Sequence, residues 1–333
     1  MDCKLKPDDV RIFSGRSHPE LAAAIALHLG IPLETTYFSR FSNDNLYIQL
    51  GASVRSRIVY IVQSLIPPVS DHLLELFMML DIARGAGARE IHAIIPYFSY
   101  ARSDKKNAPR ISITARLVAD LLETSGATHV MTMTLHSPQV HGFFRIPTDP
   151  LTARGLFINH LRELQQEVNF NSSDTVVVAP DYGRAGSAAR LAHQFGLPSI
   201  SAEKTRVSDT TVHIGELITK QVAGFSRALI YDDEIATGGS VITLAKFLVT
   251  SGIKEIFTVC THGLFFGDAL LQIRSIPEIT HIITTDTVPI PLDKRPPNLT
   301  ILSVAPLIAD AIWRNYTRQS IGPLFDFGED EGD

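Results

Sequence analysis

The sequence lacks the features that would place it outside the ordinary globular proteins. Its 333 residues include only two cysteines, Cys3 and Cys260, too few for a disulfide framework or a cysteine-based metal site. Its 30 basic residues are outnumbered by 35 acidic ones, so the chain lacks the net positive charge that is typical of nucleic-acid-binding proteins. No apolar run is long enough to span a bilayer, and the first residues do not resemble a signal peptide. We therefore expect a cytoplasmic protein without a nucleic-acid or membrane partner.

What is present is an alternation of short apolar strands with longer helical patterns. The predicted strands are Arg57–Val62, Ile91–Ile95, Val130–Leu135, Thr175–Ala179, Arg227–Tyr231, Ile256–Cys260, His281–Thr285 and Thr300–Val304. Apolar residues spaced three and four apart predict the helices Asp71–Ala83, Thr114–Thr124, Leu151–Gln166, Gly186–Phe195 and Val241–Thr250. Such alternation is typical of right-handed parallel units with helices on both faces of a sheet.

The pattern runs through the chain twice, with a proline-containing break at Pro147–Leu151. This predicts an α/β fold of two similar doubly wound domains with mainly parallel sheets. The first domain is expected to hold residues 1–149 and the second 150–305. A C-terminal helix at about 306–320 is expected to pack back on the first domain.

The segment RALIYDDEIATGGSV carries the sharpest chemical signal. A buried strand is expected to end at Tyr231, followed by Asp232 and Asp233, then by the glycine-rich run Ala236–Ser240 and a helix from about Val241. Glycines permit a tight turn whose N–H groups, with the positive end of the helix, can hold a phosphate. The adjacent carboxylates are good acceptors for the hydroxyls of a sugar phosphate. An ordinary strand–turn–helix corner with an acidic cap is the alternative.

A second signal is a basic loop after the strand Ile91–Ile95. Arg102, Lys105, Lys106 and Arg110 lie within nine positions. Cations concentrated after a strand suit a polyphosphate, because an arginine can bind two phosphate oxygens at once. A solvated basic loop is the alternative.

Two further charged residues follow predicted strands. His136 and Asp181, like Arg102 and Asp232, are expected at the carboxyl ends of strands, where open α/β sheets bind ligands. Magnesium takes one or two protein ligands and completes its shell with water and phosphate oxygens, and His136 with Asp181 could form such a sparse shell. Taken singly, His136 could be a structural histidine and Asp181 a helix cap.

These segments resemble a known family. DDEIATGGS is similar to the phosphoribosyl diphosphate (PRPP) motif of the phosphoribosyltransferase fold. IPYFSYARSDKK and LHSPQVHGFFRIPTDPL are similar to motifs of ribose-phosphate pyrophosphokinases, which make PRPP, and the resemblance covers nearly the whole chain. It implies that the diphosphoryl group of ATP is transferred to ribose 5-phosphate with Mg²⁺, the first domain facing ATP and the second facing the sugar.

The resemblance also implies roles for individual residues. ATP is assigned to Phe41, Asn43, Asp44, Asn45, Arg102, Ser103, Lys105 and His136. Ribose 5-phosphate is assigned to Arg206, Asp232, Asp233, Ala236, Thr237, Gly238, Gly239 and Ser240. Magnesium is assigned to His136 and Asp181, and catalysis to Lys204 and Arg206, on a polar lid at Ser201–His213. A plain surface hairpin is the alternative for that lid.

Some positions depart from the family pattern. Asn45 stands where an acidic residue is usual, Ser103 replaces a usual glutamine, and Ala236 replaces a usual aspartate. Two alternatives therefore stay open, a phosphoribosyltransferase that consumes PRPP and a non-catalytic synthetase-like subunit. The family implies homo-oligomers, commonly hexamers built from dimers.

Overall fold

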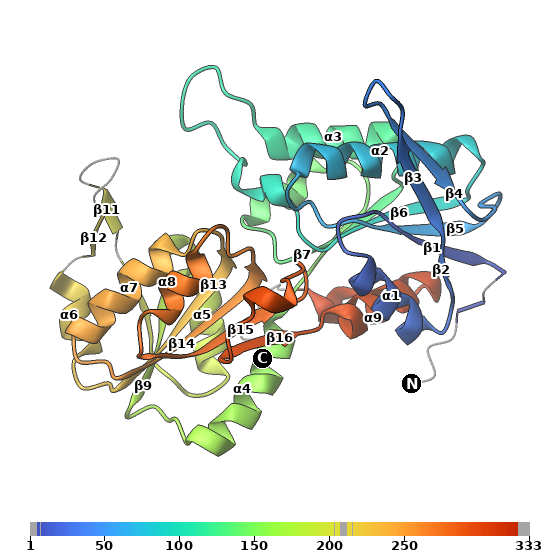
Figure 1. The fold of residues 1–333 in the computed structure, drawn as a ribbon. Coiled ribbons are helices and arrows are strands. Elements are labelled where there is room, and N and C mark those ends of the chain that lie inside the picture. The colour runs from blue at the N-terminus through green and yellow to red at the C-terminus, as the bar shows by residue number, and fades with distance from the viewer. Residues whose placement is uncertain (1–4, 7, 203, 207–211, 215, 326–333) are drawn as a thin grey trace. The chain divides into compact units, whose positions relative to one another are not determined.

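The computed structural model describes residues 5, 6, 8–202, 204–206, 212–214 and 216–325, which divide into two compact units. The first unit holds the described residues up to Thr152, together with Thr287–Pro289 and the segment that begins at Ser303. The second unit holds Ala153–Asp286 and Ile290–Leu302. Each unit is built around its own sheet (Figure 1).

The sheet of the first unit has the strand order β2-β1-β5-β6-β7-β8, and all its pairings are parallel. Its strands are β1 (Val10–Ser14), β2 (Leu33–Glu34), β5 (Ile58–Val62), β6 (Glu90–Ile95), β7 (His129–Met133) and β8 (Thr148–Leu151). β5 and β7 are buried along their whole length, as continuous apolar strands in a sheet covered on both faces should be.

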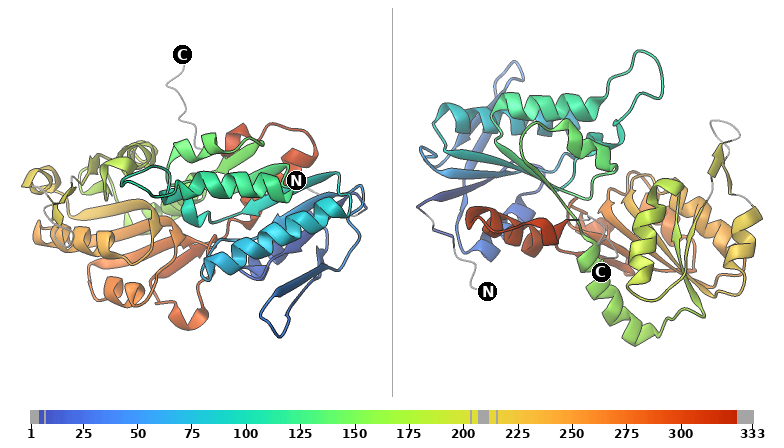
Figure 2. Two further views of the ribbon diagram at one scale, coloured as in Figure 1. Left: turned by 90° about the horizontal axis from the view of Figure 1, so that it is seen from above. Right: turned by 180° about the vertical axis from the view of Figure 1, so that it is seen from behind.

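Helices cover both faces of this sheet (Figures 1 and 2). They are α1 (Pro19–Leu29), α2 (Val69–Gly85), α3 (Thr114–Ser125) and α9 (Ala305–Tyr316). α2 and α3 lie on one face with an apolar core that includes Val59, Leu76 and Val118. α1 and α9 lie side by side on the other face, where the Tyr60 hydroxyl donates to Asn315 Oδ1 at 3.0 Å. The C-terminal helix therefore belongs to the first unit.

The sheet of the second unit has the order β10-β9-β13-β14-β15-β16, again with parallel pairings. Its strands are β9 (Thr175–Ala179), β10 (Ser199–Ser201), β13 (Arg227–Ile235), β14 (Glu255–Gly263), β15 (Ile279–Thr285) and β16 (Leu299–Leu302). Its helices are α4 (Arg154–Val168), α5 (Ala185–His193), α6 (Glu216–Val222), α7 (Gly239–Thr250) and α8 (Ala269–Arg274). Residues of α6, α7 and α8 share one core with β9 and β13, and on α4 the ring of Phe157 packs against Tyr231.

Two antiparallel hairpins lie outside these sheets. They are formed by β3 (Thr36–Arg40) with β4 (Leu46–Leu50) and by β11 (Lys204–Arg206) with β12 (Val212–Ile214). Short 3₁₀ turns complete the described structure, namely η1 (Ser99–Arg102), η2 (Pro138–Phe143), η3 (Tyr182–Arg184), η4 (Leu292–Lys294) and η5 (Gly322–Leu324). None of the helices described above is long and apolar enough to cross a membrane.

The predicted fold class, with two mainly parallel sheets, is confirmed, whereas several element boundaries were wrong. The proline-containing break at Pro147–Leu151 is largely strand β8, so the following helix begins at Arg154 rather than Leu151. Proline is tolerated there because β8 is an edge strand. α7 begins at Gly239, before the predicted Val241.

Candidate functional site

The turn between β13 and α7 has the geometry of an anion-binding loop. The five residues predicted for a phosphate are the turn residues Ala236, Thr237 and Gly238 and the first two residues of α7, Gly239 and Ser240. Gly238 has a φ of +77°, a left-handed conformation that glycine adopts without strain. A Cβ atom there would lie 3.3 Å from Ile242 Cδ1 and Ile273 Cδ1. The first N–H groups of α7 have no acceptor within the helix, and the N-cap residue Gly238 has no side chain to cap them, so this end suits a phosphate.

Asp232 and Asp233 lie inside β13 rather than after it. The predicted strand end was wrong because β13 continues past Tyr231 to Ile235 and stays paired with β14. Both acids are buried, and Asp232 Oδ1 accepts a hydrogen bond from the Asp233 N–H at 2.8 Å. Burial raises the pKa of Asp232 well above its ordinary value, and the charge of Asp233 adds to the rise. Two adjacent carboxyl groups offer several oxygen atoms to the hydroxyls of a sugar diol.

Asp181 follows β9, the strand beside β13. It begins the turn η3, and its Oδ1 accepts a hydrogen bond from the Arg184 N–H at 3.2 Å, so it does cap a turn. Val178 of β9 pairs with Ile230 of β13, and Asp181 and Asp233 each come three residues later. The structure therefore brings the two acids to the same end of the second sheet.

In the first unit, the FSNDN segment whose residues were predicted to bind ATP forms the turn between β3 and β4. The Phe41 N–H donates to the Asn45 carbonyl at 2.9 Å, and Asp44 has a φ of +66°. Asn43 Oδ1 accepts from the Asn45 N–H at 3.3 Å, so these two residues shape the turn. Phe41 is 57% exposed, with its ring 5.8 Å from that of Tyr47. An exposed aromatic ring on a turn can stack on a base.

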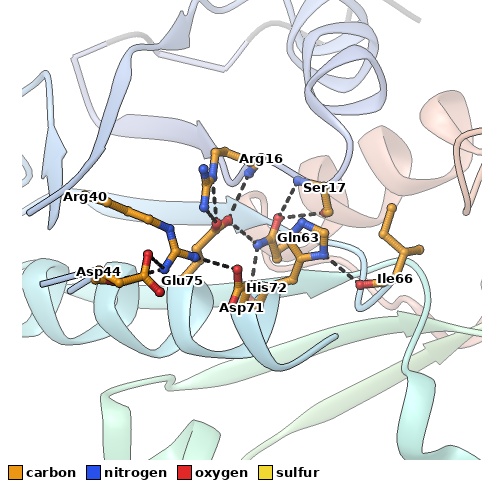
Figure 3. A network of polar contacts seen from close by, with 9 residues as sticks. All are labelled: Arg16, Ser17, Arg40, Asp44, Gln63, Ile66, Asp71, His72 and Glu75. Carbon is orange, nitrogen blue, oxygen red and sulfur yellow. Dashed lines mark hydrogen bonds and ion pairs between the residues drawn. The ribbon is translucent and has the colours of Figure 1, made fainter. Parts of the chain in front are cut away.

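Arg40 ties this turn to helix α2 (Figure 3). Its guanidinium donates to the carbonyl and Oδ1 of Asp44, both at 3.0 Å, and to Asp71 Oδ2 at 2.5 Å. All three side chains are about a third or more exposed, so this arrangement contributes little to stability. Its consequence is geometric, because it fixes the turn against the first turn of α2.

A buried polar network near this turn was missed by the sequence analysis (Figure 3). Glu75 of α2 is fully buried and accepts from Arg16 Nε at 2.7 Å and from Gln63 Nε2 at 2.9 Å. Gln63 Oε1 accepts in turn from the N–H and hydroxyl of Ser17. The one available signal was Glu75 itself, a charged residue beside Leu76 on the apolar side of α2. The network fixes the loop after β1.

The predicted polyphosphate loop does not directly follow its strand. β6 ends at Ile95, whereas Arg102 closes the turn η1 and is exposed, as is Lys105. Ser103 has a structural task, because its hydroxyl accepts from the Thr114 N–H at 3.2 Å at the start of α3. The exposed cations could contact phosphates, while Ser103 anchors the loop to α3.

His136 is half-buried and lies in the connection between β7 and η2. β7 ends at Met133, so His136 does not directly follow a strand as predicted. Over the part of the chain that the structure describes, no three histidine, cysteine or acidic side chains gather into a metal cluster. Magnesium needs only one or two protein ligands, so a carboxylate such as that of Asp181 fits it, while an imidazole is a less usual ligand.

Lys204 and Arg206 are described by their backbone alone. They lie in β11, where Lys204 pairs with Ile214 and Arg206 with Val212. Residues 203 and 207–211 of the predicted lid lie outside the described residues. The side chains of Lys204 and Arg206 likewise lie outside the description, so their roles stay predictions.

Parallel sheets with helices on both faces, and a glycine-rich turn after a strand that carries adjacent acids, define a phosphoribosyltransferase-like α/β protein. Two family models match the chain. The N-terminal domain of ribose phosphate pyrophosphokinase matches residues 10–126, and the phosphoribosyl synthetase-associated domain matches residues 174–326. The chain belongs to the ribose-phosphate pyrophosphokinase family.

Individual relatives span almost the whole chain. A Streptomyces coelicolor protein, provisionally named ribose-phosphate pyrophosphokinase, is 46% identical over 318 residues, which cover 96% of this chain and 98% of that protein. The ribose-phosphate pyrophosphokinase of Deinococcus radiodurans is 41% identical, over 94% of this chain and 97% of its own. The crystal structure of phosphoribosylpyrophosphate synthetase from Mycobacterium smegmatis matches with a TM-score of 0.85 at 34% identity, over 93% of this chain and 99% of that one. The family membership predicted from the sequence motifs is confirmed.

Proposed function

We propose that this enzyme transfers the diphosphoryl group of Mg-ATP to the 1-hydroxyl of ribose 5-phosphate, giving PRPP and AMP. The observation that carries the proposal is the β13–α7 segment, where buried Asp232 and Asp233 precede a glycine-rich turn on a helix N-terminus. In a chain that matches its family along almost its whole length, this segment fits a phosphorylated pentose.

On the sugar side, the turn Ala236–Ser240 would hold the 5-phosphate through backbone N–H groups. Asp232 and Asp233, both buried in β13, would hold ring hydroxyls through their carboxyl oxygens. The 1-hydroxyl oxygen then attacks the β-phosphorus of ATP and loses its proton. The bond from that phosphorus to the bridging oxygen of the α-phosphate breaks, and AMP leaves.

On the nucleotide side, Phe41 would stack on the base while Asn43 and Asn45 offer it neutral hydrogen-bonding groups. Arg102 and Lys105 would contact phosphates. Magnesium held by Asp181 together with phosphate oxygens would neutralise charge on the transferred group, and His136 is the second proposed ligand. The carboxylate of Asp181, at the end of the second sheet, supports this assignment more than the imidazole does.

Lys204 and Arg206 would close over the reacting phosphates and stabilise negative charge in the transition state. The position of both residues on a hairpin, β11–β12, is compatible with a segment that approaches bound substrate. Their proposed role is catalytic, whereas that of the Ala236–Ser240 turn is binding.

We also propose that the enzyme self-associates. Leu74 of α2 and Leu117 and Leu121 of α3 are exposed by 51%, 45% and 38%, and these two helices contact each other. Exposed leucines on two neighbouring helices suit contact with a second copy of the chain. Light scattering on the purified protein should give a mass of at least twice the 36.6 kDa of one chain.

Phosphorus NMR tests the proposed reaction against both alternatives. With Mg-ATP and ribose 5-phosphate, AMP and PRPP should appear together in equal amounts. PRPP loss that requires a free base, without ATP turnover, would instead identify a phosphoribosyltransferase. No reaction alone, but stimulation of an active relative, would identify a regulatory subunit.

A further inference from the structure

Arg184 is a buried cation beside the acids of the second unit. It ends the turn η3, which follows β9, and only 9% of its surface is exposed. Arginine keeps its charge inside proteins, so this position places a permanent positive charge near the carboxyl end of the second sheet. A charge that is removed from water needs partners of opposite sign, and the neighbouring acids provide them.

Arg184 contacts acids from two elements. Its backbone N–H donates to Asp181 Oδ1 at 3.2 Å, and its Nε lies 3.5 Å from Asp233 Oδ1. The side chains of Arg184 and Asp233 are 11% and 3% exposed, so solvent screens this ion pair weakly. Arg184 therefore joins the connection after β9 to the acidic part of β13.

Three carboxyl groups lie close enough here to influence one another. After burial, the charges of Asp233 and Asp181 both contribute to the raised pKa of Asp232. A sugar phosphate would bring further negative charge to this place, and like charges repel more strongly where solvent is scarce. A fixed cation within the cluster offsets that repulsion.

We propose that Arg184 is a positioning residue of the ribose 5-phosphate site, whose built-in countercharge lets the anionic sugar phosphate bind without a divalent cation. This inference rests on the proposed function. The guanidinium group holds Asp233 in place for the sugar hydroxyls, while the backbone N–H orients Asp181. A divalent cation at Asp181 supplies charge of the same sign, so Mg²⁺ compensates in part when Arg184 is absent.

Calorimetric titration of the full-length protein with ribose 5-phosphate tests this, once in EDTA and once with saturating Mg²⁺. The variants are Arg184→Met, which keeps an apolar stem without charge, and Arg184→Lys, which keeps the charge. Arg227→Met is the matched control. Arg227 also lies in the second unit and forms a partly buried ion pair, with its Nε 2.6 Å from Glu255 Oε2, but at the opposite end of β13.

In EDTA, Arg184→Met should raise the dissociation constant of ribose 5-phosphate about tenfold or more, and in Mg²⁺ less than about threefold. Arg184→Lys and Arg227→Met should stay within about threefold of the unaltered protein in both buffers. The urea midpoint of each variant reports the loss of folding stability separately.

Two results would overturn the inference alone. One is unchanged binding by Arg184→Met in EDTA. The other is an equal loss in both buffers that Arg227→Met reproduces, since this would make Arg184 merely structural. If the unaltered protein failed to bind ribose 5-phosphate in either buffer, both this inference and the proposed function would be wrong.

Discussion

Replacing Arg16 by methionine should destabilise the first unit by about 2–3 kcal/mol, because it removes a charged partner of the fully buried Glu75. Breaking a buried ion pair from one side costs about 3–5 kcal/mol. Two features reduce this figure. The Arg16 side chain is 44% exposed, and Gln63 Nε2 still donates to Glu75 at 2.9 Å.

Trp313 provides the assay, because it is the single tryptophan of the sequence and lies in α9, which packs in the first unit. Urea unfolding followed by its fluorescence reports on that unit. In a double-mutant cycle, combining Arg16→Met with Glu75→Gln should recover about 1–2 kcal/mol relative to the sum of the single changes. If the free energy of unfolding of Arg16→Met differed from that of the unaltered protein by less than about 0.5 kcal/mol, the reasoning would be refuted.

Three further changes test other parts of the structure. Gly15→Ala should destabilise the first unit by about 1–3 kcal/mol, because the new Cβ would lie 2.2 Å from Gln63 Oε1. That oxygen cannot move away easily, since it accepts a hydrogen bond from the Ser17 hydroxyl. An unchanged urea midpoint would contradict this prediction. Burial lowers the pKa of His92, so the unfolded state takes up its proton first and stability should fall as the pH drops below about 6.5. The urea midpoint, followed by Trp313 fluorescence, should depend less on pH between 7.5 and 5 in His92→Asn than in the unaltered protein. An equal pH dependence in both proteins would show that His92 is not the group responsible. Lys204→Ala should reduce turnover about a hundredfold or more at an unchanged urea midpoint, and a near-normal rate would remove Lys204 from the catalytic residues.

How far the sequence predicts the fold depends on whether a strand is apolar throughout. β9 is buried at every position, and its predicted bounds, Thr175–Ala179, match the structure. β13 was predicted too short because Asp232 and Asp233 look like strand ends, yet backbone pairing with β14 continues through them. The β3–β4 hairpin was not predicted, since its strands alternate with exposed residues and contain no continuous apolar run.

In the candidate site, features formed by consecutive residues could be predicted, whereas contacts between residues far apart in the sequence could not. The turn Ala236–Ser240 could be predicted because its glycines, acids and helix start are consecutive in the sequence. The bond between Gln63 and Glu75 could not, because it depends on how α2 packs against β5. The contact of Arg184 with Asp233 joins the connection after β9 to strand β13, so it also required the structure.

The central claim is that the diphosphoryl group moves whole from ATP to the pentose. ATP labelled with phosphorus-32 at the β-position tests this most directly, with ribose 5-phosphate and Mg²⁺ in excess and the products separated by chromatography. The label should pass entirely into PRPP, leaving AMP unlabelled. Label recovered in ADP, with an unlabelled ribose bisphosphate as the sugar product, would show transfer of one phosphoryl group and contradict the account.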